Sequence, residues 1–477
     1  MDERFRIRIP RLRVLTDDKR ELIHLSTLEV MRRTGISVKD EKALGIFKKG
    51  GCYVEGNMVR IPAHLVEWAL RNTPPRLALC NRQGEPALFL EKNNAYFGTG
   101  SDTPNILDPY TNQRRPAVLK DIENVSKVVD YLPELGFIMC AGIASDVNST
   151  ISDLYHFDAM VNNTEKPIVF TAWSLDNLKA IIEMAELVAG GTAELRNNPF
   201  IALYTEPISP LTLAVESAQK LMFMAEKSLP VVFTPGLLTG ATGPVTIAGG
   251  LIQANAEMLS GYVLANLIRE GVPFVYGGGV LPLDMRVSLM SYASPEFMLA
   301  TSAFTDMARY YSLPMFSFAG CSDSNSFDQQ ATLEGSLWIL LSSLNGGNLI
   351  HDVGYINNGL TTAFEQIVVS NEVIGMVRHI TRGIEFNEDT MALDLIDEIG
   401  PGGEFLTCEH TLKHFRDNFY PELITRETYE KWENEGRKDL GTRANEKARY
   451  ILEQYKPRIL EDKLRTELNK IIKAMDR

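Results

Sequence analysis

Several aromatic, acidic and imidazole side chains in this chain directly follow, or lie within, short apolar runs that end in glycine or proline. Ring faces attract a permanent cation, so a cluster of rings with acids nearby and few lysines or arginines predicts a site for a methylated amine. Any single ring could instead belong to the hydrophobic core, so only the cluster carries the argument. The candidate rings and imidazole are Tyr96, Phe97, Trp173, Tyr204, Phe318, Tyr355 and His351, with Glu206 as a nearby acid.

Three groups could carry further chemistry. His351 could act as a general acid or base or bind a substrate carboxylate, although a structural histidine is an alternative. Cys321 could be a nucleophile if His351 served as its base, which leaves a thiol mechanism open. His410 and His414 have the i, i+4 spacing of helical metal ligands. Because they lack an HExxH order and lie outside the apolar runs, we expect packing or an interface there and predict no metal centre.

The elements that would position these groups alternate regularly. Each apolar run is followed by a longer amphipathic segment, which is typical of βα units. The eight runs span 94–100, 137–142, 167–173, 200–207, 230–236, 273–279, 314–320 and 348–354. Eight such repeats predict an α/β fold, a (β/α)8 TIM barrel with its active site at the carboxyl ends of the strands. A doubly wound open sheet is the alternative, but no GxGxxG turn follows the first run.

Outside the barrel, assigned to 93–385, we predict two helical extensions. Residues 1–92 show helical spacing in 15–35 and 62–72, and residues 386–477 are charged and helical. The C-terminal extension is expected to pack on the barrel or on a neighbouring subunit, which leads us to expect a homo-oligomer.

Composition excludes several classes of protein. The 477 residues carry 48 Lys and Arg against 61 Asp and Glu, a formal charge of -13, which argues against a nucleic-acid surface. No apolar stretch reaches the ~18 residues of a membrane span, and the first residues lack the apolar core of a signal peptide. We therefore expect a cytoplasmic protein without a membrane partner. Five cysteines without a CxxC pair predict reduced thiols rather than a disulfide framework.

Five segments together resemble the trimethylamine methyltransferase (MttB) family. They are TEPISPL (205–211), TPGLLTGATGPVTIAGGLIQANAE (234–257), AGCSDSNSFDQQATLE (319–334), GNLIHDVGYINNGLT (347–361) and CEHTLKHFR (408–416). The resemblance implies methyl transfer from a methylated amine to the Co(I) of a separate corrinoid protein. The trimethylamine enzymes of the family carry pyrrolysine just before the SDS stretch, where this chain has Cys321. The resemblance therefore indicates the non-pyrrolysine branch, which is similar to glycine betaine:corrinoid methyltransferases.

A quaternary ammonium is already an activated leaving group, so the site must mainly position the methyl group. We expect His351 and Glu206 to be the catalytic groups and the candidate rings, with His351, to bind the substrate. Glycine-rich strand ends could cradle a phosphate, serve tight turns or admit a large flat ligand. We assign contacts with the cobalamin to Gly277, Gly278, Gly279, Cys321, Ser322 and Asp323.

The corrinoid is expected on a partner protein. A resident cobalamin of the usual type needs DxHxxG, and the near match LIHDVG (349–354) lacks the first aspartate. Proline betaine, carnitine or butyrobetaine are alternative substrates, and a non-catalytic betaine-binding protein is an alternative function. A Schiff-base aldolase is disfavoured because no lysine stands at the predicted strand ends.

Overall fold

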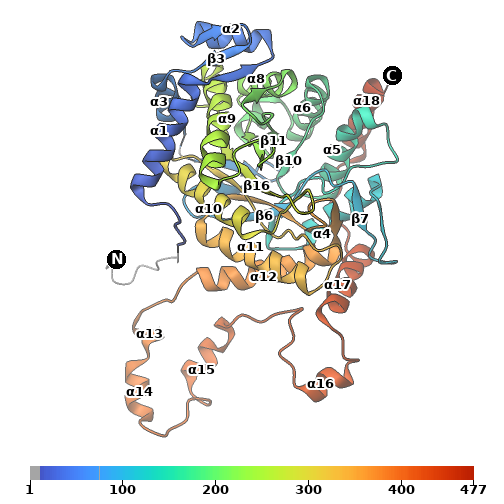
Figure 1. Ribbon diagram of the computed structural model, residues 1–477. Helices are drawn as coiled ribbons and strands as arrows, with labels where there is room; N and C mark the ends of the chain where they lie inside the picture. The colour runs from blue at the N-terminus through green and yellow to red at the C-terminus, as the bar shows by residue number, and fades with distance from the viewer. Residues whose placement is uncertain (1–10, 75, 477) are drawn as a thin grey trace.

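The computed structural model describes residues 11–74 and 76–476, and a barrel of eight parallel strands lies at its centre (Figure 1). The strands are β6 (Tyr96–Thr99), β9 (Leu135–Phe137), β10 (Ile168–Phe170), β11 (Ile201–Thr205), β13 (Val231–Phe233), β15 (Phe274–Gly277), β18 (Met315–Phe318) and β19 (Leu349–Val353). The last strand, β19, pairs with the first, β6, and a bridge between Ile138 and Ile168 joins β9 to β10. Each predicted run overlaps one of these strands, so the predicted α/β barrel is confirmed.

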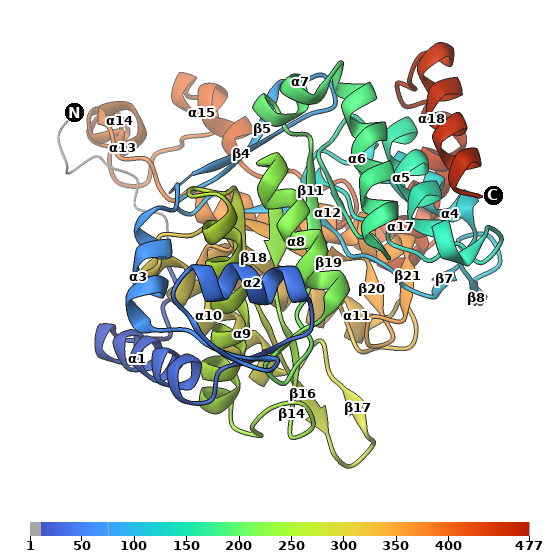
Figure 2. The ribbon, with the colours of Figure 1, turned by 90° about the horizontal axis from the view of Figure 1, so that it is seen from above.

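Helices connect successive strands and surround them (Figure 2). They are α4 (Leu119–Tyr131), α5 (Ser152–Asn163), α6 (Leu175–Ala189), α7 (Thr192–Asn197), α8 (Val215–Lys227), α9 (Ile247–Ile268), α10 (Pro295–Tyr310), α11 (Gln329–Asn345) and α12 (Phe364–Thr381), with a 3-10 turn at Ser149–Ile151. Their ends follow local sequence. Ser294 caps α10 with Pro295 as its first residue, and Gly190, at φ +87°, ends α6.

Alternate strand residues fill the barrel interior, as expected for period-two side chains. Val169, Val232 and Val275 are fully buried there. The hairpin of β4 (Leu77–Cys80) and β5 (Pro86–Leu90) adds apolar side chains, including Leu79, to the same cluster and so covers the amino end of the barrel. The carboxyl end of the barrel is not covered by this hairpin, and it is the end at which barrels of this type place their active sites.

Short sheets extend the loops at the carboxyl ends. One joins β7 (Asn105–Leu107) and β8 (Arg114–Pro116), after the first barrel strand, to β20 (Tyr355–Ile356) and β21 (Thr361–Ala363), after the last. Another joins β14 (Gly236–Thr239), β16 (Gly279–Asp284) and β17 (Leu289–Met290). These hydrogen-bonded loops build walls around the mouth of the barrel.

The N-terminal region contains more than the predicted helices. Helices α1 (Asp17–Arg33), α2 (Glu41–Lys49) and α3 (Ala63–Arg71) are accompanied by strands β1 (Ile36–Val38), β2 (Tyr53–Glu55) and β3 (Met58–Arg60). Strand β1 pairs with β12 (Thr212–Leu213), which belongs to the loop after β11. Strands this short depend on a partner distant in sequence, so the local pattern did not indicate them.

The C-terminal extension is helical, as predicted, but falls into two parts. Helices α17 (Leu440–Gln454) and α18 (Asp462–Met475) pack on the barrel helices, α17 on α4 and α12, and α18 on α5 and α6. Between α12 and α17, the short helices α13 (Glu388–Met391), α14 (Leu393–Ile399), α15 (Glu409–His414) and α16 (Tyr429–Asn434) extend away from the barrel (Figure 1). In the part of the chain that the structure describes, no helix is long and apolar enough to cross a membrane.

Candidate active site

His351 lies at the centre of the barrel mouth, on β19. Its ring stacks on Phe316 with centroids 4.1 Å apart and lies 4.5 Å from the Phe318 ring and 6.2 Å from the Tyr204 ring. Nδ1 is 2.6 Å from Asp352 Oδ1 without hydrogen-bond geometry, and neither ring nitrogen has a hydrogen-bond partner among the described residues. Because buried polar groups are normally paired, an enclosed imidazole with two unpaired nitrogens is a candidate ligand-binding group.

Tyr204 and Glu206 point into the same space from β11 and the residue after it. The Tyr204 hydroxyl donates to a Glu206 carboxylate oxygen. Burial raises the pKa of Glu206, while the Tyr204 hydrogen bond and the positive charge of His351 lower it. Burial also raises the pKa of Tyr204 well above its usual value, and the Glu206 charge adds to this. A bound cation would favour the charged form of Glu206.

Two more carboxylates stand at the strand ends in unusual backbone conformations. Asp352 has φ +77° and Asp102 has φ +62°, both in the left-handed region. Asp352 is buried, and its Oδ2 has no hydrogen-bond partner among the described residues. Asp102 Oδ1 accepts from Cys140 Sγ at 3.2 Å and from Thr171 Oγ1 at 3.3 Å. The acids therefore converge on the mouth.

Asp102, Cys140 and His156 bring three metal-ligating groups together within 4.8 Å. Protein groups already occupy much of this cluster, because the Ala144 N–H donates to His156 Nε2 at 3.1 Å and the Cys140 thiol donates to Asp102. Burial lowers the pKa of His156 to about 4, so the ring is neutral near pH 7. Burial also raises the pKa of the Cys140 thiol.

Tyr355 and Tyr292 form an aromatic pair at the barrel mouth. Their rings meet edge to face with centroids 6.2 Å apart. The Tyr355 hydroxyl donates to the Ser101 carbonyl, and its ring lies so close to Gly100 that a Cβ there would overlap it. The prediction included Tyr355 but missed Tyr292, which belongs to the loop before α10 and carries no signal at a strand end.

Lys220, on α8, was also missed. Its Nζ donates to the Ala172 carbonyl, just past β10, at 2.7 Å. Burial lowers the pKa of Lys220, whereas the nearby acids, among them Glu206 and Asp102, raise it. The prediction of few lysines or arginines considered only residues at strand ends, whereas this cation comes from a helix.

The structure does not bring three of the predicted rings into this group. Tyr96 begins β6, at the amino end of the barrel, where its hydroxyl accepts from the Phe89 N–H at 3.2 Å. Phe97, one residue later, belongs to the core between strands and helices. Trp173 lies on the rim, 56% exposed, with its Nε1–H donating to Ser152 Oγ at 3.1 Å.

The three predicted glycines differ in their surroundings. A Cβ at Gly277 would lie 3.0 Å from the Phe316 carbonyl oxygen, and one at Gly279 would lie 2.7 Å from the Leu281 side chain and 3.5 Å from the Phe318 ring, so both glycines pack closely against neighbouring strands. A Cβ at Gly278 would lie 2.8 Å from the Phe304 ring on α10, so this glycine faces the surrounding helices instead.

The segment Cys321–Asp323 is locked in place. Ser322 Oγ donates to Glu334 at 2.6 Å, and the Asp323 carboxylate accepts from the Tyr292 N–H at 2.8 Å. Cys321 is fully buried, and burial raises the pKa of its thiol well above its usual value. The thiol therefore stays protonated at neutral pH, which argues against the thiolate chemistry that the sequence left open.

Comparisons with known proteins agree on one family. A family model described as Trimethylamine methyltransferase (MTTB) matches residues 3–476. The trimethylamine methyltransferase MttB of Desulfitobacterium hafniense (strain DSM 10664 / DCB-2) is 31% identical over 97% of this chain and 93% of that protein. The glycine betaine methyltransferase of D. hafniense (strain Y51) is 30% identical over 97% of each chain.

Among solved structures, the hydroxylamine complex of MtmB aligns with a TM-score of 0.48 and 12% identity, covering 95% of this chain and 93% of that chain. The family match and the curated relatives extend over nearly the whole length of the sequence. The chain therefore belongs to the trimethylamine methyltransferase (MTTB) family.

Proposed function

We propose that this protein transfers a methyl group from a quaternary amine of the glycine betaine type to the Co(I) of a separate corrinoid protein. Membership of the family supports methyl transfer from a methylated amine. The chain is about equally similar to a trimethylamine enzyme and to a glycine betaine enzyme, so these comparisons do not identify the methyl donor. The choice of donor therefore depends on the residues of the site. The resemblance of the SDS segment supports the quaternary amine, because Cys321 stands where the trimethylamine enzymes carry pyrrolysine.

The observation that carries the proposal is the environment of His351. Its ring is enclosed by Phe316, Phe318 and Tyr204, its Nδ1 lies against Asp352, and its Nε2 has no hydrogen-bond partner among the described residues. With Nδ1 facing Asp352, the ring can present an Nε2–H to a substrate carboxylate. A charge-assisted hydrogen bond of this kind contributes about 1.5–3 kcal/mol.

The trimethylammonium end needs a different environment, which the acids and rings provide. Glu206 and Asp352 supply negative charge, and Tyr204, Tyr292 and Tyr355 supply ring faces, the combination that holds a cation unable to donate hydrogen bonds. As the C–N bond breaks, nitrogen keeps the electron pair and becomes a neutral tertiary amine, so the site has no proton to supply. Binding and orientation are the main tasks of these residues.

The corrinoid, when its partner protein docks at the mouth, supplies the cobalt(I) nucleophile that accepts the methyl group. Gly277 and Gly279, at the end of β15 and the start of β16, and the buried segment Cys321–Asp323 would form the part of the rim that meets the corrinoid. His351 lies within a barrel strand and stacks on Phe316, so it is poorly placed to ligate a resident cobalamin from below. This supports delivery by a partner.

The test is anaerobic methylation of free cobalamin reduced to Co(I), followed by its visible spectrum. We expect conversion with glycine betaine and none with trimethylamine, while proline betaine, carnitine and butyrobetaine define the substrate range. The reaction is repeated with His351→Ala and with His64→Ala, an exposed histidine on α3, as the matched control. Conversion of trimethylamine alone would refute the quaternary-amine assignment. Saturable betaine binding without conversion, even with a corrinoid protein present, would support the binding protein instead.

A further inference from the structure

The segment between α12 and α17 has almost no core of its own. Helices α13, α14, α15 and α16 contain no buried residue, and α13 and α15 are only 4 and 6 residues long. Helices this short are unstable in water without tertiary contacts. Conformational entropy would therefore favour many disordered conformations of this segment unless a contact holds α13 and α15 together.

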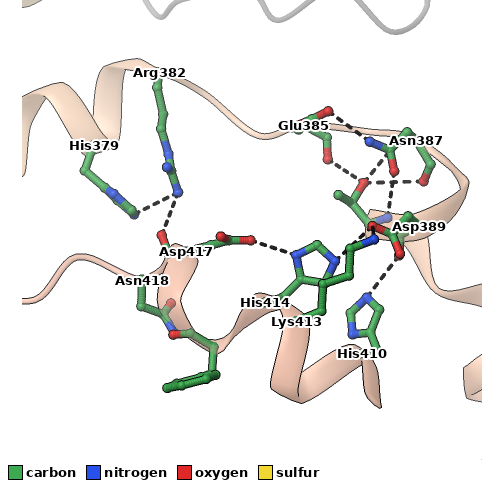
Figure 3. Close-up of polar contacts among 12 residues, drawn as sticks. His379, Arg382, Glu385, Asn387, Asp389, His410, Lys413, His414, Asp417 and Asn418 are labelled. Carbon is green, nitrogen blue, oxygen red and sulfur yellow. Dashed lines mark hydrogen bonds and ion pairs between the residues drawn. The ribbon is translucent and has the colours of Figure 1, made fainter. Parts of the chain in front are cut away.

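One cluster of side chains makes that link (Figure 3). His410 and His414 lie one turn apart on α15, with ring centroids 4.5 Å apart, and both face Asp389 of α13. His414 Nε2 lies 3.0 Å from Asp389 Oδ2, and His410 Nε2 lies 3.0 Å from the Asp389 carbonyl oxygen. One potential ligand atom from each of the three residues lies within 4.8 Å of the others.

A second carboxylate, that of Asp417, orients the His414 ring. Its Nδ1 lies 2.7 Å from Asp417 Oδ2, so a proton on Nδ1 is held by Asp417 and Nε2 is directed at Asp389. A carboxylate that holds the distal nitrogen of a histidine is the usual support of a metal-binding imidazole.

We propose that Asp389, His410 and His414 bind a divalent transition metal ion, with zinc as the best match to two imidazoles and one carboxylate. Two ligands about 2.1 Å from one tetrahedral zinc lie about 3.4 Å apart, so the observed grouping needs only small side-chain movements. Water completes the coordination.

One cation competes for the site. Lys413 Nζ lies 2.6 Å from Asp389 Oδ2, but its side chain is 60% exposed and can turn into solvent when an ion takes its place. His414 and Asp389 are 24% and 45% exposed, so an ion can enter without the segment unfolding.

The bound ion would hold α13 and α15 together, since neither helix contains a buried residue. We call this cross-link the clip. Metal bound only by the folded form adds its binding free energy to the stability of that form. The sequence showed the histidine pair but not Asp389, which is 21 residues from His410 and comes near only in the fold. The sequence predicted no metal centre because the pair lacks an HExxH order and lies outside the strand ends, and Asp389 was not considered.

The binding test uses tag-free full-length protein, freed of metal by a chelator, and Zn²⁺ as the probe. We expect one saturable equivalent by calorimetry and by metal analysis after desalting. His414→Ala and Asp389→Asn should each lose at least tenfold in affinity, and His64→Ala should bind like the wild type. No saturable equivalent, or equal binding by all variants, would overturn the proposal.

Proteolysis gives an independent readout of the clip. Phe405 and Leu406 are exposed between α14 and α15 and offer chymotrypsin a site. Zinc at ten times its dissociation constant should slow cleavage there about tenfold if cleavage requires opening of the clip. The protection should be absent in His414→Ala and present in His64→Ala. Protection that persists in His414→Ala would refute the assignment of the ligands.

Discussion

The contact between Gly100 and Tyr355 gives a sharp prediction of stability and binding together. The Cβ of Gly100→Ala would overlap Cζ and Cε1 of the Tyr355 ring, whereas non-bonded carbon atoms need about 3.5 Å or more between them. The ring cannot move freely, because its hydroxyl is bonded to the Ser101 carbonyl and it meets Tyr292 edge to face. Overpacking of this kind costs about 1–3 kcal/mol.

That cost translates into a measurable shift. At about 2.1 cal/mol/K per residue, unfolding of this chain has an entropy near 1 kcal/mol/K, so Gly100→Ala should lower the calorimetric Tm by about 1–3 °C. The control is Gly45→Ala on α2, where a Cβ would meet nothing within 4 Å. That change should stabilise the helix slightly. Displacement of the ring should also weaken the binding of quaternary amines.

A double-mutant cycle isolates the cause. If the ring is responsible, Gly100→Ala should cost less than about 0.5 kcal/mol when Tyr355 is already replaced by Leu, because contacting residues are not additive. An equal penalty in both backgrounds would refute the argument. So would a Gly100→Ala variant as mild as Gly45→Ala.

Three further predictions concern the site and a buried acid. His351→Ala should raise the Kd for betaines about tenfold or more, in line with 1.5–3 kcal/mol, but should affect tetramethylammonium, which has no carboxylate, much less. Tyr355→Ala should weaken tetramethylammonium binding by about 1–2 kcal/mol, whereas the exposed Trp173→Ala should cost at most about 0.5–1 kcal/mol. Burial raises the pKa of Asp158 to about 6, so the folded protein binds its proton more tightly than the unfolded chain. Its contribution to stability is complete below pH 3.8 and is lost as the pH rises through 6.

Each of these three predictions has an outcome that would contradict it. Equal losses for betaine and tetramethylammonium would remove His351 from the carboxylate site. A larger effect of Trp173→Ala than of Tyr355→Ala would move the cation to the rim. Asp158→Asn keeps an acceptor for Asn162 and should stabilise the protein at pH 7–8 but not at pH 3.5, as measured by urea unfolding. A constant difference across that range would contradict the assigned pKa.

The barrel was predictable because its signals are local. Apolar runs and amphipathic helices repeat along the chain, and the structure has a strand at each run and a helix at each amphipathic segment. Helix α9 begins at Ile247, although Gly249 and Gly250 in its first turn weaken the helical pattern of the sequence. A Cβ at Gly250 would lie 2.7 Å from Val280, so close packing on β16 explains that glycine.

The site was predictable only in part, because a position near a strand end does not tell whether the side chain points into the barrel mouth or toward the surrounding helices. Within the run at 94–100, strand β6 begins at Tyr96, which therefore lies at the amino end of the barrel, and the Phe97 side chain points outward to the surrounding helices. The same alternation could have identified Phe316, which shares a strand face with Phe318 and stacks on His351. Tyr292 and Lys220 reach the mouth from a loop and a helix, and no strand pattern could reveal them.

The backbone at the strand ends supports a binding role for the mouth more strongly than the residue types do. Asp102, Ala141 and Asp352 all have positive φ, a conformation that costs a non-glycine residue about 1–3 kcal/mol. Asp352 also keeps a buried carboxylate oxygen without a hydrogen-bond partner among the described residues, beside an imidazole in the same condition. Such groups destabilise the free protein, and the betaine of the proposed function, a cation with its own carboxylate, would relieve both. A site arranged in advance for that charge pattern need not reorganise when the substrate binds, which is the most effective form of electrostatic stabilisation.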